Sequence, residues 1–162
     1  MEIAGLPLHP LVVHTTVTLV PLSALVSVVF AVVPRWRWLL RWPAGVLAVL
    51  AAVVAWVSRL SGSALLEDRP FLLDSPQLRD QIERHQQLGE LLSLVSLPYA
   101  ALVLLASWSL AGTTALASGR GARESRLPAL EKVLLVLVVL FSLGVLVLVV
   151  LTGDSGARAV WG

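Results

Sequence analysis

Hydrophobic residues in this chain are gathered into four long runs that carry almost no charge. We expect these runs to span a membrane at residues 10–33, 39–57, 88–110 and 130–151. A helix needs about 20 apolar residues to cross the roughly 30 Å hydrocarbon core of a bilayer, and each run is close to that length. The pattern therefore predicts an all-α fold, an integral membrane four-helix bundle that forms one domain over residues 1–162.

Prolines and glycines mark where several of these helices begin and end. Pro10 suits the first turn of a helix, where its missing N–H is not needed, and Pro34 ends the first run. Gly153 follows the fourth run, where a helix C′ residue is expected. Before the second run, Arg35 and Arg37 alternate with tryptophans. This mixture is typical of the membrane interface, where such side chains anchor helix ends.

The longest polar stretch separates the second and third runs. Its first part, residues 61–75, has the composition of a loop or an interfacial segment. Ser75 and Pro76 then suit the N-cap and first position of a helix. His85 falls on the apolar face of that helix. We expect one long helix here, amphipathic over its first turns up to residue 87 and then entering the membrane.

Composition supports the membrane assignment and excludes several classes of protein. Of the 162 residues, 57% are hydrophobic and 14% are charged, whereas soluble domains carry about 25% charged residues. The net charge of +2 does not indicate nucleic acid binding, because the basic residues sit in short loops and form no stripe. The chain has no cysteine, which excludes disulfides, thiolate zinc sites, all-cysteine iron–sulfur ligation and covalently attached haem.

The distribution of basic residues between the loops predicts the orientation of the bundle. The first loop holds Arg35, Arg37 and Arg41 without any acid, and the third loop is also rich in arginine. The segment before the first run has no Lys or Arg, and the C-terminal tail has only Arg158. Because basic loops remain in the cytoplasm, we expect a multi-pass protein of the bacterial plasma membrane with both termini and residues 58–87 outside.

Four spans bring every histidine of the chain to one membrane surface, since the start of the first helix, the start of the third and the end of the fourth share that face. The residues expected there are His9, His14, His85 and Asp154. His14 lies roughly 6 Å, about one helical turn, inside Pro10. Ionisable side chains at that depth usually face a partner or a cavity. His9 and His14 are separated by roughly 140° around a helix, so they do not share one face.

His14 and His85 are the pair that we expect to face each other, with His9 at the helix mouth. Two histidines on different helices of a bundle can ligate a b-type haem, and Arg84 is among the arginines available to its propionates. A second interpretation is a Zn, Cu or proton-linked site built from the three histidines and Asp154. A third is a structural or interaction subunit whose histidines only form hydrogen bonds.

No complete catalytic motif accompanies these histidines. A combination of Ser155, His85 and Asp154 lacks the nucleophile-elbow motif of hydrolases, so we expect no stand-alone enzyme. Four helices without a charge buried in mid-span also offer little for a transport path. No internal repeat of fixed period is found. The expected partners are membrane lipid and a redox protein or another membrane subunit, with no nucleic acid.

A family resemblance rests on three segments, LHPLVVH at residues 8–14, RHQQLG at residues 84–89 and TGDSGARAVWG at residues 152–162. They resemble the opening HP-x-x-x-H pattern, the later helix-start histidine and the glycine-flanked ending of an uncharacterised bacterial membrane family, domain of unknown function 2231. The four-span layout is similar to that family along nearly the whole chain. The resemblance implies a four-helix membrane fold.

The resemblance also implies redox work, because some relatives are joined to Rieske-type or cytochrome c domains. Carried over position by position, it points to His9, His14 and His85. Family members often have a histidine where this chain has Asp154. Our leading hypothesis is therefore a haem-binding or redox-associated membrane module that passes electrons near the outer face.

We predict that Gly119 and Gly162 lie on opposite sides of the membrane, because a single span separates them. Reporter fusions at these two positions should report opposite compartments. Agreement between the two reporters would show that the number of spans is wrong.

Overall fold

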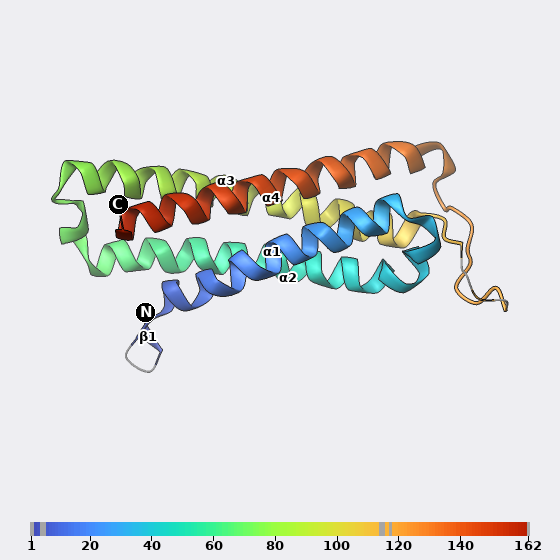
Figure 1. Ribbon diagram of the computed structural model, residues 1–162, viewed down its shortest axis with the longest axis horizontal. Helices are drawn as coiled ribbons and strands as arrows, with labels where there is room; N and C mark the ends of the chain where they lie inside the picture. The colour runs from blue at the N-terminus through green and yellow to red at the C-terminus, as the bar shows by residue number, and fades with distance from the viewer. Residues whose placement is uncertain (1, 4–5, 114–115, 117, 162) are drawn as a thin grey trace.

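Four long helices dominate the computed structural model, which describes residues 2–3, 6–113, 116 and 118–161. Within those residues the helices are α1 (Leu8–Val32), α2 (Arg37–Asp68), α3 (Pro76–Ser109) and α4 (Glu131–Trp161). Consecutive helices run antiparallel, so the two ends of the chain and the α2–α3 connection lie at the same end of the bundle (Figure 1). The predicted all-α bundle is confirmed.

Short elements complete the described fold. Two-residue strands pair in an antiparallel hairpin before α1, and single 3₁₀ turns that begin with proline precede the other three helices. These elements are β1 (Glu2–Ile3), β2 (Leu6–Pro7), η1 (Pro34–Trp36), η2 (Pro70–Leu73) and η3 (Pro128–Leu130).

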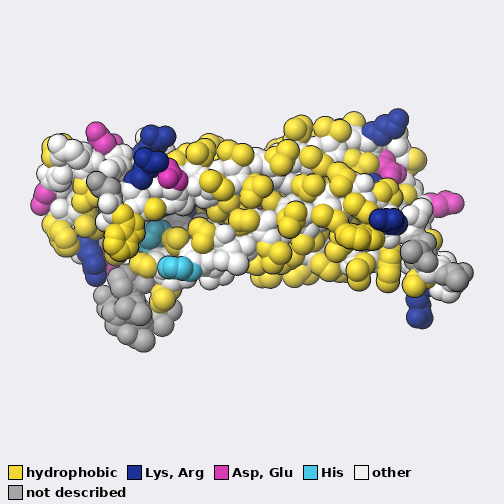
Figure 2. Space-filling model, viewed as in Figure 1, with side chains coloured by type: hydrophobic (Ala, Val, Ile, Leu, Met, Phe, Trp, Pro, Cys, Tyr) yellow, Lys and Arg dark blue, Asp and Glu magenta, His cyan; other side chains and the backbone are white. Residues whose placement is uncertain are grey.

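The outer surface of the bundle matches a membrane environment. All four helices are long and apolar enough to cross a bilayer. Hydrophobic side chains cover the middle of the bundle in the space-filling view, while charged side chains gather towards its two ends (Figure 2). The described residues therefore provide four candidate membrane spans, as the hydrophobic pattern predicts.

Two helices continue well beyond the apolar runs that predict them in the sequence. α2 extends to Asp68, so residues 61–68 are helical and the expectation of a loop there is wrong. α4 extends to Trp161, so Gly153 lies inside the helix and is not its C′ residue. Hydropathy marks where a helix leaves the hydrocarbon, whereas its backbone hydrogen bonds can continue outside it. Both extensions carry residues of the site described below.

α3 begins where the sequence predicts, with Ser75 at the N-cap position and Pro76 in the first turn. It then continues through Pro98 as one helix. The ring of Pro98 removes one backbone N–H, but the helix continues on both sides of it. A single helix therefore carries both His85, near the end of the bundle where the termini lie (Figure 1), and Tyr99, in the core.

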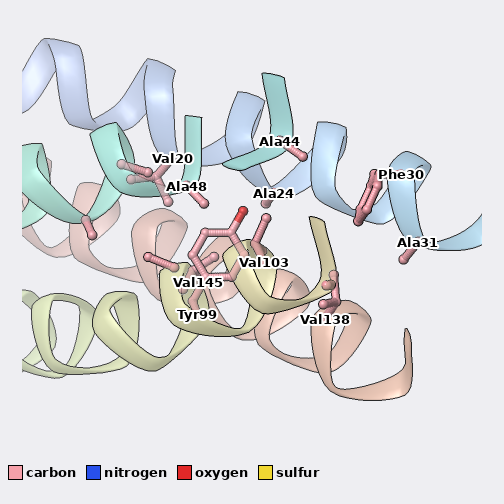
Figure 3. Packing of buried hydrophobic residues seen from close by; sticks show 14 of the residues in the cluster. Val20, Ala24, Phe30, Ala31, Ala44, Ala48, Tyr99, Val103, Val138 and Val145 are labelled. Atoms are coloured by element: carbon pink, nitrogen blue, oxygen red, sulfur yellow. The ribbon is translucent and has the colours of Figure 1, made fainter. Parts of the chain in front are cut away.

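Small side chains allow α2 to approach its neighbours closely. Its buried face is formed largely by Ala44, Ala48, Ala51 and Ala55. Two of these alanines are seen among the buried side chains of the other helices in Figure 3. Inside a bilayer the hydrophobic effect does not drive helices together, so association depends on close van der Waals packing, which small residues permit.

Tyr99 provides the central polar link of this core (Figure 3). Its side chain is fully buried, and its hydroxyl oxygen lies 2.8 Å from Ser23 Oγ and 2.9 Å from Ser27 Oγ. Both serines belong to α1, whereas Tyr99 belongs to α3. Because a buried hydroxyl without a partner is costly, these bonds favour one relative placement of the two helices.

Arg37 joins the helices at the end of the bundle that is remote from the termini. Its guanidinium donates to the carbonyls of Phe30 at 3.2 Å and Ala31 at 2.9 Å, in the last turn of α1. It also donates to the carbonyl of Ala111 at 3.0 Å and to Glu131 Oε1 at 3.1 Å. The side chain is buried, so its interpretation as a surface anchor is wrong. It instead satisfies carbonyls that a helix end leaves without partners.

Replacing Arg37 with alanine should destabilise the bundle by about 3–5 kcal/mol, because Glu131 would then remain half-buried without its cation. Thermal unfolding of the purified protein in detergent measures this loss. The matched control is Arg35→Ala, since Arg35 is exposed and an exposed side chain contributes about 0.5 kcal/mol or less. Equal losses in the two variants would contradict the structural role of Arg37.

Candidate functional site

His9 and His85 meet near the end of the bundle that carries both termini. His9 comes from the first turn of α1 and His85 from the third turn of α3. Their ring centroids are 6.1 Å apart, and the ring planes differ by 75°. Both side chains are half-buried. The two imidazoles thus form a pair that joins one half of the chain to the other.

The ring of His9 is held by the last turns of α2. Its Nδ1 lies 3.0 Å from the carbonyl oxygen of Ser58 and 3.1 Å from Ser61 Oγ. A carbonyl oxygen can only accept a hydrogen bond, so Nδ1 must carry the proton and donate it. The Ser61 hydroxyl donates to the same carbonyl at 2.9 Å, which leaves its oxygen lone pairs free to accept from His9.

The ring of His85 is held in the same way by α4. Its Nδ1 lies 3.0 Å from the carbonyl oxygen of Thr152 and 3.1 Å from Ser155 Oγ. Ser155 in turn donates to the Thr152 carbonyl at 2.8 Å. With the proton fixed on Nδ1, the Nε2 of each neutral histidine keeps its lone pair.

A glycine makes room for each imidazole. A methyl group placed on Gly62 would lie 3.1 Å from Cε1 of His9, and one placed on Gly156 would lie 2.9 Å from Cε1 of His85. Both separations are shorter than an ordinary carbon–carbon contact of about 3.5–4.0 Å. Each ring therefore rests directly on the backbone of the neighbouring helix, where only glycine fits without a shift.

The backbone carbonyl, serine and glycine that hold each imidazole form what we call its cradle. The two cradles share one sequence pattern, which is not apparent from hydropathy or from fixed-period repeats. Ser58-x-x-Ser61-Gly62 on α2 corresponds to Thr152-x-x-Ser155-Gly156 on α4, with a hydroxyl residue, a serine and a glycine in the same order. The interval from histidine to cradle is 49 residues in the first half and 67 in the second. A search for a repeat of fixed period cannot find such a pair, whereas a comparison of the two helix ends can.

His14 does not take the role expected for it. Its Nδ1 lies 2.6 Å from the carbonyl of Pro10, one turn earlier in the same helix, and its side chain is exposed. The ring in contact with His85 belongs to His9, so the predicted pairing of His14 with His85 is wrong. Because α1 begins at Leu8, His9 is already helical, and the roughly 140° between His9 and His14 directs only one of the two towards His85.

The remaining candidate residues lie outside the histidine pair. Asp154 is exposed and forms an ion pair with Arg158, with 2.9 Å between Oδ2 and Nε. Arg84 is also exposed. Among the described residues, no three His, Asp or Glu side chains are grouped closely enough to hold a metal ion. The expected ligand set of three histidines and Asp154 is therefore not assembled.

A cavity of about 860 Å³ adjoins the pair and is lined by all four helices. Ligand pockets commonly have volumes of about 300–1,000 Å³. Its walls are mainly apolar, with His9, His14 and His85 among the polar exceptions. At its rim, Arg59 on α2 and Glu90 on α3 form an ion pair of 2.7 Å. The cavity can accept a largely apolar group within reach of the two imidazoles.

Comparison with known proteins identifies the family of the chain. No curated protein and no solved structure matches it. The family described as "Predicted membrane protein (DUF2231)" matches residues 5–162, which is nearly the whole sequence. The family resemblance seen in the sequence is thus confirmed, and the chain belongs to the DUF2231 family of predicted membrane proteins.

Proposed function

We propose that this four-span membrane protein is a haem-binding electron-transfer module, in which His9 and His85 would hold the iron of a b-type haem. One observation carries the proposal. Two imidazoles from different helices lie 6.1 Å apart, and each donates its Nδ1 proton to a backbone carbonyl. Histidines that ligate metals usually donate their other ring N–H in this manner, which fixes the tautomer and raises the basicity of the ligand.

The separation of the rings supports two ligands on one metal ion. An imidazole nitrogen coordinates a metal at about 2.0–2.1 Å. The ring centroid lies about 1.2 Å behind that nitrogen, so two imidazoles on opposite sides of a metal have centroids about 6.4 Å apart. The centroids of His9 and His85 are 6.1 Å apart, close to that separation.

The number of ligands favours haem over a bare metal ion. Structural zinc sites use four protein ligands and catalytic ones use three, whereas the described residues bring together a pair of histidines and no third ligand. A porphyrin supplies four nitrogens of its own, so haem iron needs two protein ligands at most. The mainly apolar walls of the adjoining cavity also suit a macrocycle.

The chain would contribute positioning and electronic tuning. When bound, haem supplies one-electron chemistry. Ser58 and Thr152 hold the ligand rings through their carbonyls, and Ser61 and Ser155 add a second contact to each Nδ1. These bonds to Nδ1 would raise the basicity of both imidazoles as ligands. The expected partner is a redox protein or membrane subunit that meets the end of the bundle carrying the termini.

A purely structural role is the second candidate, and one observation favours it. Each histidine bonds to the helix that follows it, so these bonds would stabilise the α1–α2 and α3–α4 hairpins without any ligand. In that case, removal of either imidazole would reduce stability and change no cofactor content.

His9→Ala and His85→Ala should each abolish haem binding, because an axial pair acts as a unit, and the double variant should be no worse. The absorbance of the Soret band per protein, measured after purification with haem supplied, reports the bound fraction. His14→Ala is the matched control and should retain most of the band, since His14 lines the cavity but its Nδ1 bonds to Pro10 of its own helix.

Added imidazole provides a check against simple misfolding. It should restore part of the Soret band in His9→Gly and His85→Gly, because it can occupy the vacated position. The proposal is wrong if the wild-type protein binds no haem, or if His14→Ala loses as much as the other two variants.

Gly156→Ala should weaken haem binding by about 10- to 100-fold, the usual effect of disturbing a residue that orients a metal ligand. The new methyl group would lie 2.9 Å from Cε1 of His85 and displace the ring. Haem titration measures the affinity. Gly144→Ala on the same helix is the control, because its methyl group would meet nothing within 4 Å. Equal affinities in the two variants would exclude a positioning role for Gly156.

A further inference from the structure

A second cavity, of about 600 Å³, lies at the other end of the bundle. Its walls come from the first half of α2, the last turns of α3 and the connection between α3 and α4. The three basic residues that line it are Arg41, Arg123 and Arg126. This cavity is separate from the histidine site and has a different chemical character.

The three arginines form a positive cluster in the lining of this cavity. Arg41 on α2 is close enough to Arg123 and Arg126 to be repelled by both. None of the residues lining the cavity is Asp or Glu. Like charges held together in this way favour an anion between them.

Two of the arginines are fixed in position by Trp108, near the end of α3. Arg123 donates from Nη2 to the carbonyl oxygen of Trp108 at 2.7 Å. The guanidinium of Arg126 lies 4.6 Å from the centroid of the Trp108 ring, within the range of a cation–π interaction. The connection therefore presents its charges to the cavity in a defined arrangement.

Arg41 has donors that the described part of the protein does not use. Its Nε and Nη2 atoms are buried and have no hydrogen-bond partner there. Arg37, one turn earlier on the same helix, uses Nε, Nη1 and Nη2 in hydrogen bonds to four acceptors. A buried N–H of a charged group without an acceptor is costly, so Arg41 is suited to an external acceptor.

An apolar groove continues from this cluster along the outside of the bundle. Val46, Val49 and Leu50 on α2 and Leu104 on α3 line the cavity and are exposed. Gly45 on α2 lies opposite Leu104 on α3, and its lack of a side chain deepens the groove between the two helices. A linear hydrocarbon chain suits a surface of this shape within the membrane-spanning part of the helices.

We propose that this cavity binds one anionic phospholipid, whose phosphate is held by the three arginines and whose acyl chain lies in the groove between α2 and α3. Arginine pairs with phosphate through several parallel N–H bonds. Basic pockets between helices on the cytoplasmic side are typical sites for anionic lipid headgroups. The positive-inside pattern places this end of the bundle on that side.

The test compares phosphatidylglycerol with phosphatidylcholine on the full-length protein, by native mass spectrometry of lipid retained after purification. The wild type should retain phosphatidylglycerol preferentially. Arg41→Gln should lower that affinity about fivefold, and Arg123→Gln with Arg126→Gln about 25-fold, from about 1 kcal/mol per basic residue. Arg41→Lys, which keeps the charge, should lose less than Arg41→Gln.

The matched control is Arg120→Gln, since Arg120 belongs to the same connection but does not line the cavity. It should retain the lipid as well as the wild type does. Only variants whose thermal unfolding matches that of the wild type are compared. Equal retention of the two lipids, or equal losses for Arg120→Gln and Arg41→Gln, would overturn the proposal. Inorganic phosphate that competes as strongly as phosphatidylglycerol would show an anion site rather than a lipid site, and would also overturn it.

Discussion

The requirement that buried polar groups find partners shapes both the core and the histidine site of this structure, although some side chains, such as Arg41, leave it unmet among the described residues. Between helices in a membrane no water is at hand to replace a missing hydrogen bond. Tyr99 meets the requirement with two serine hydroxyls, and Arg37 meets it with carbonyls at a helix end. His9 and His85, near one end of the bundle, meet it through Nδ1. Among the described residues neither Nε2 has a hydrogen bond, and these are the nitrogens through which we propose that a ligand is held.

The histidine site depends on the docking of two similar hairpins. The hairpin of α1 and α2 contributes His9 with its cradle, and the hairpin of α3 and α4 contributes His85 with an equivalent one. Neither hairpin holds a complete pair. Packing of the alanine face of α2 and the bonds of Tyr99 bring the hairpins together, so the core of the bundle sets the separation of the two imidazoles.

Much of the fold could be predicted from the sequence, because the length of an apolar run reports directly on a membrane span. The same signal fails at helix ends. Residues 61–68 and the turns after Gly153 are polar enough to resemble loops, yet they remain helical and carry the serines and glycines of the cradles. Hydropathy does not distinguish such turns from loops, because polar side chains are compatible with both.

The choice between His9 and His14 shows a different limit. The angle of roughly 140° between them correctly indicates that they cannot share one face. The depth of His14 in an uncharged run favours it as the residue that faces inward. In the structure, however, its Nδ1 donates to the carbonyl of Pro10 on the same helix. A local bond of this kind removes the need for a partner on another helix. Sequence alone does not reveal which residue has one.

In the proposed site, His9 and His85 would both ligate one haem iron. Electron paramagnetic resonance of the oxidised, haem-loaded protein tests it most directly, because the spectrum reports both the spin state and the axial ligands of the iron. We expect a low-spin signal typical of two imidazole ligands. This signal should be lost in His9→Ala and in His85→Ala. A high-spin signal with one axial ligand, or a low-spin signal that persists without His9, would contradict it.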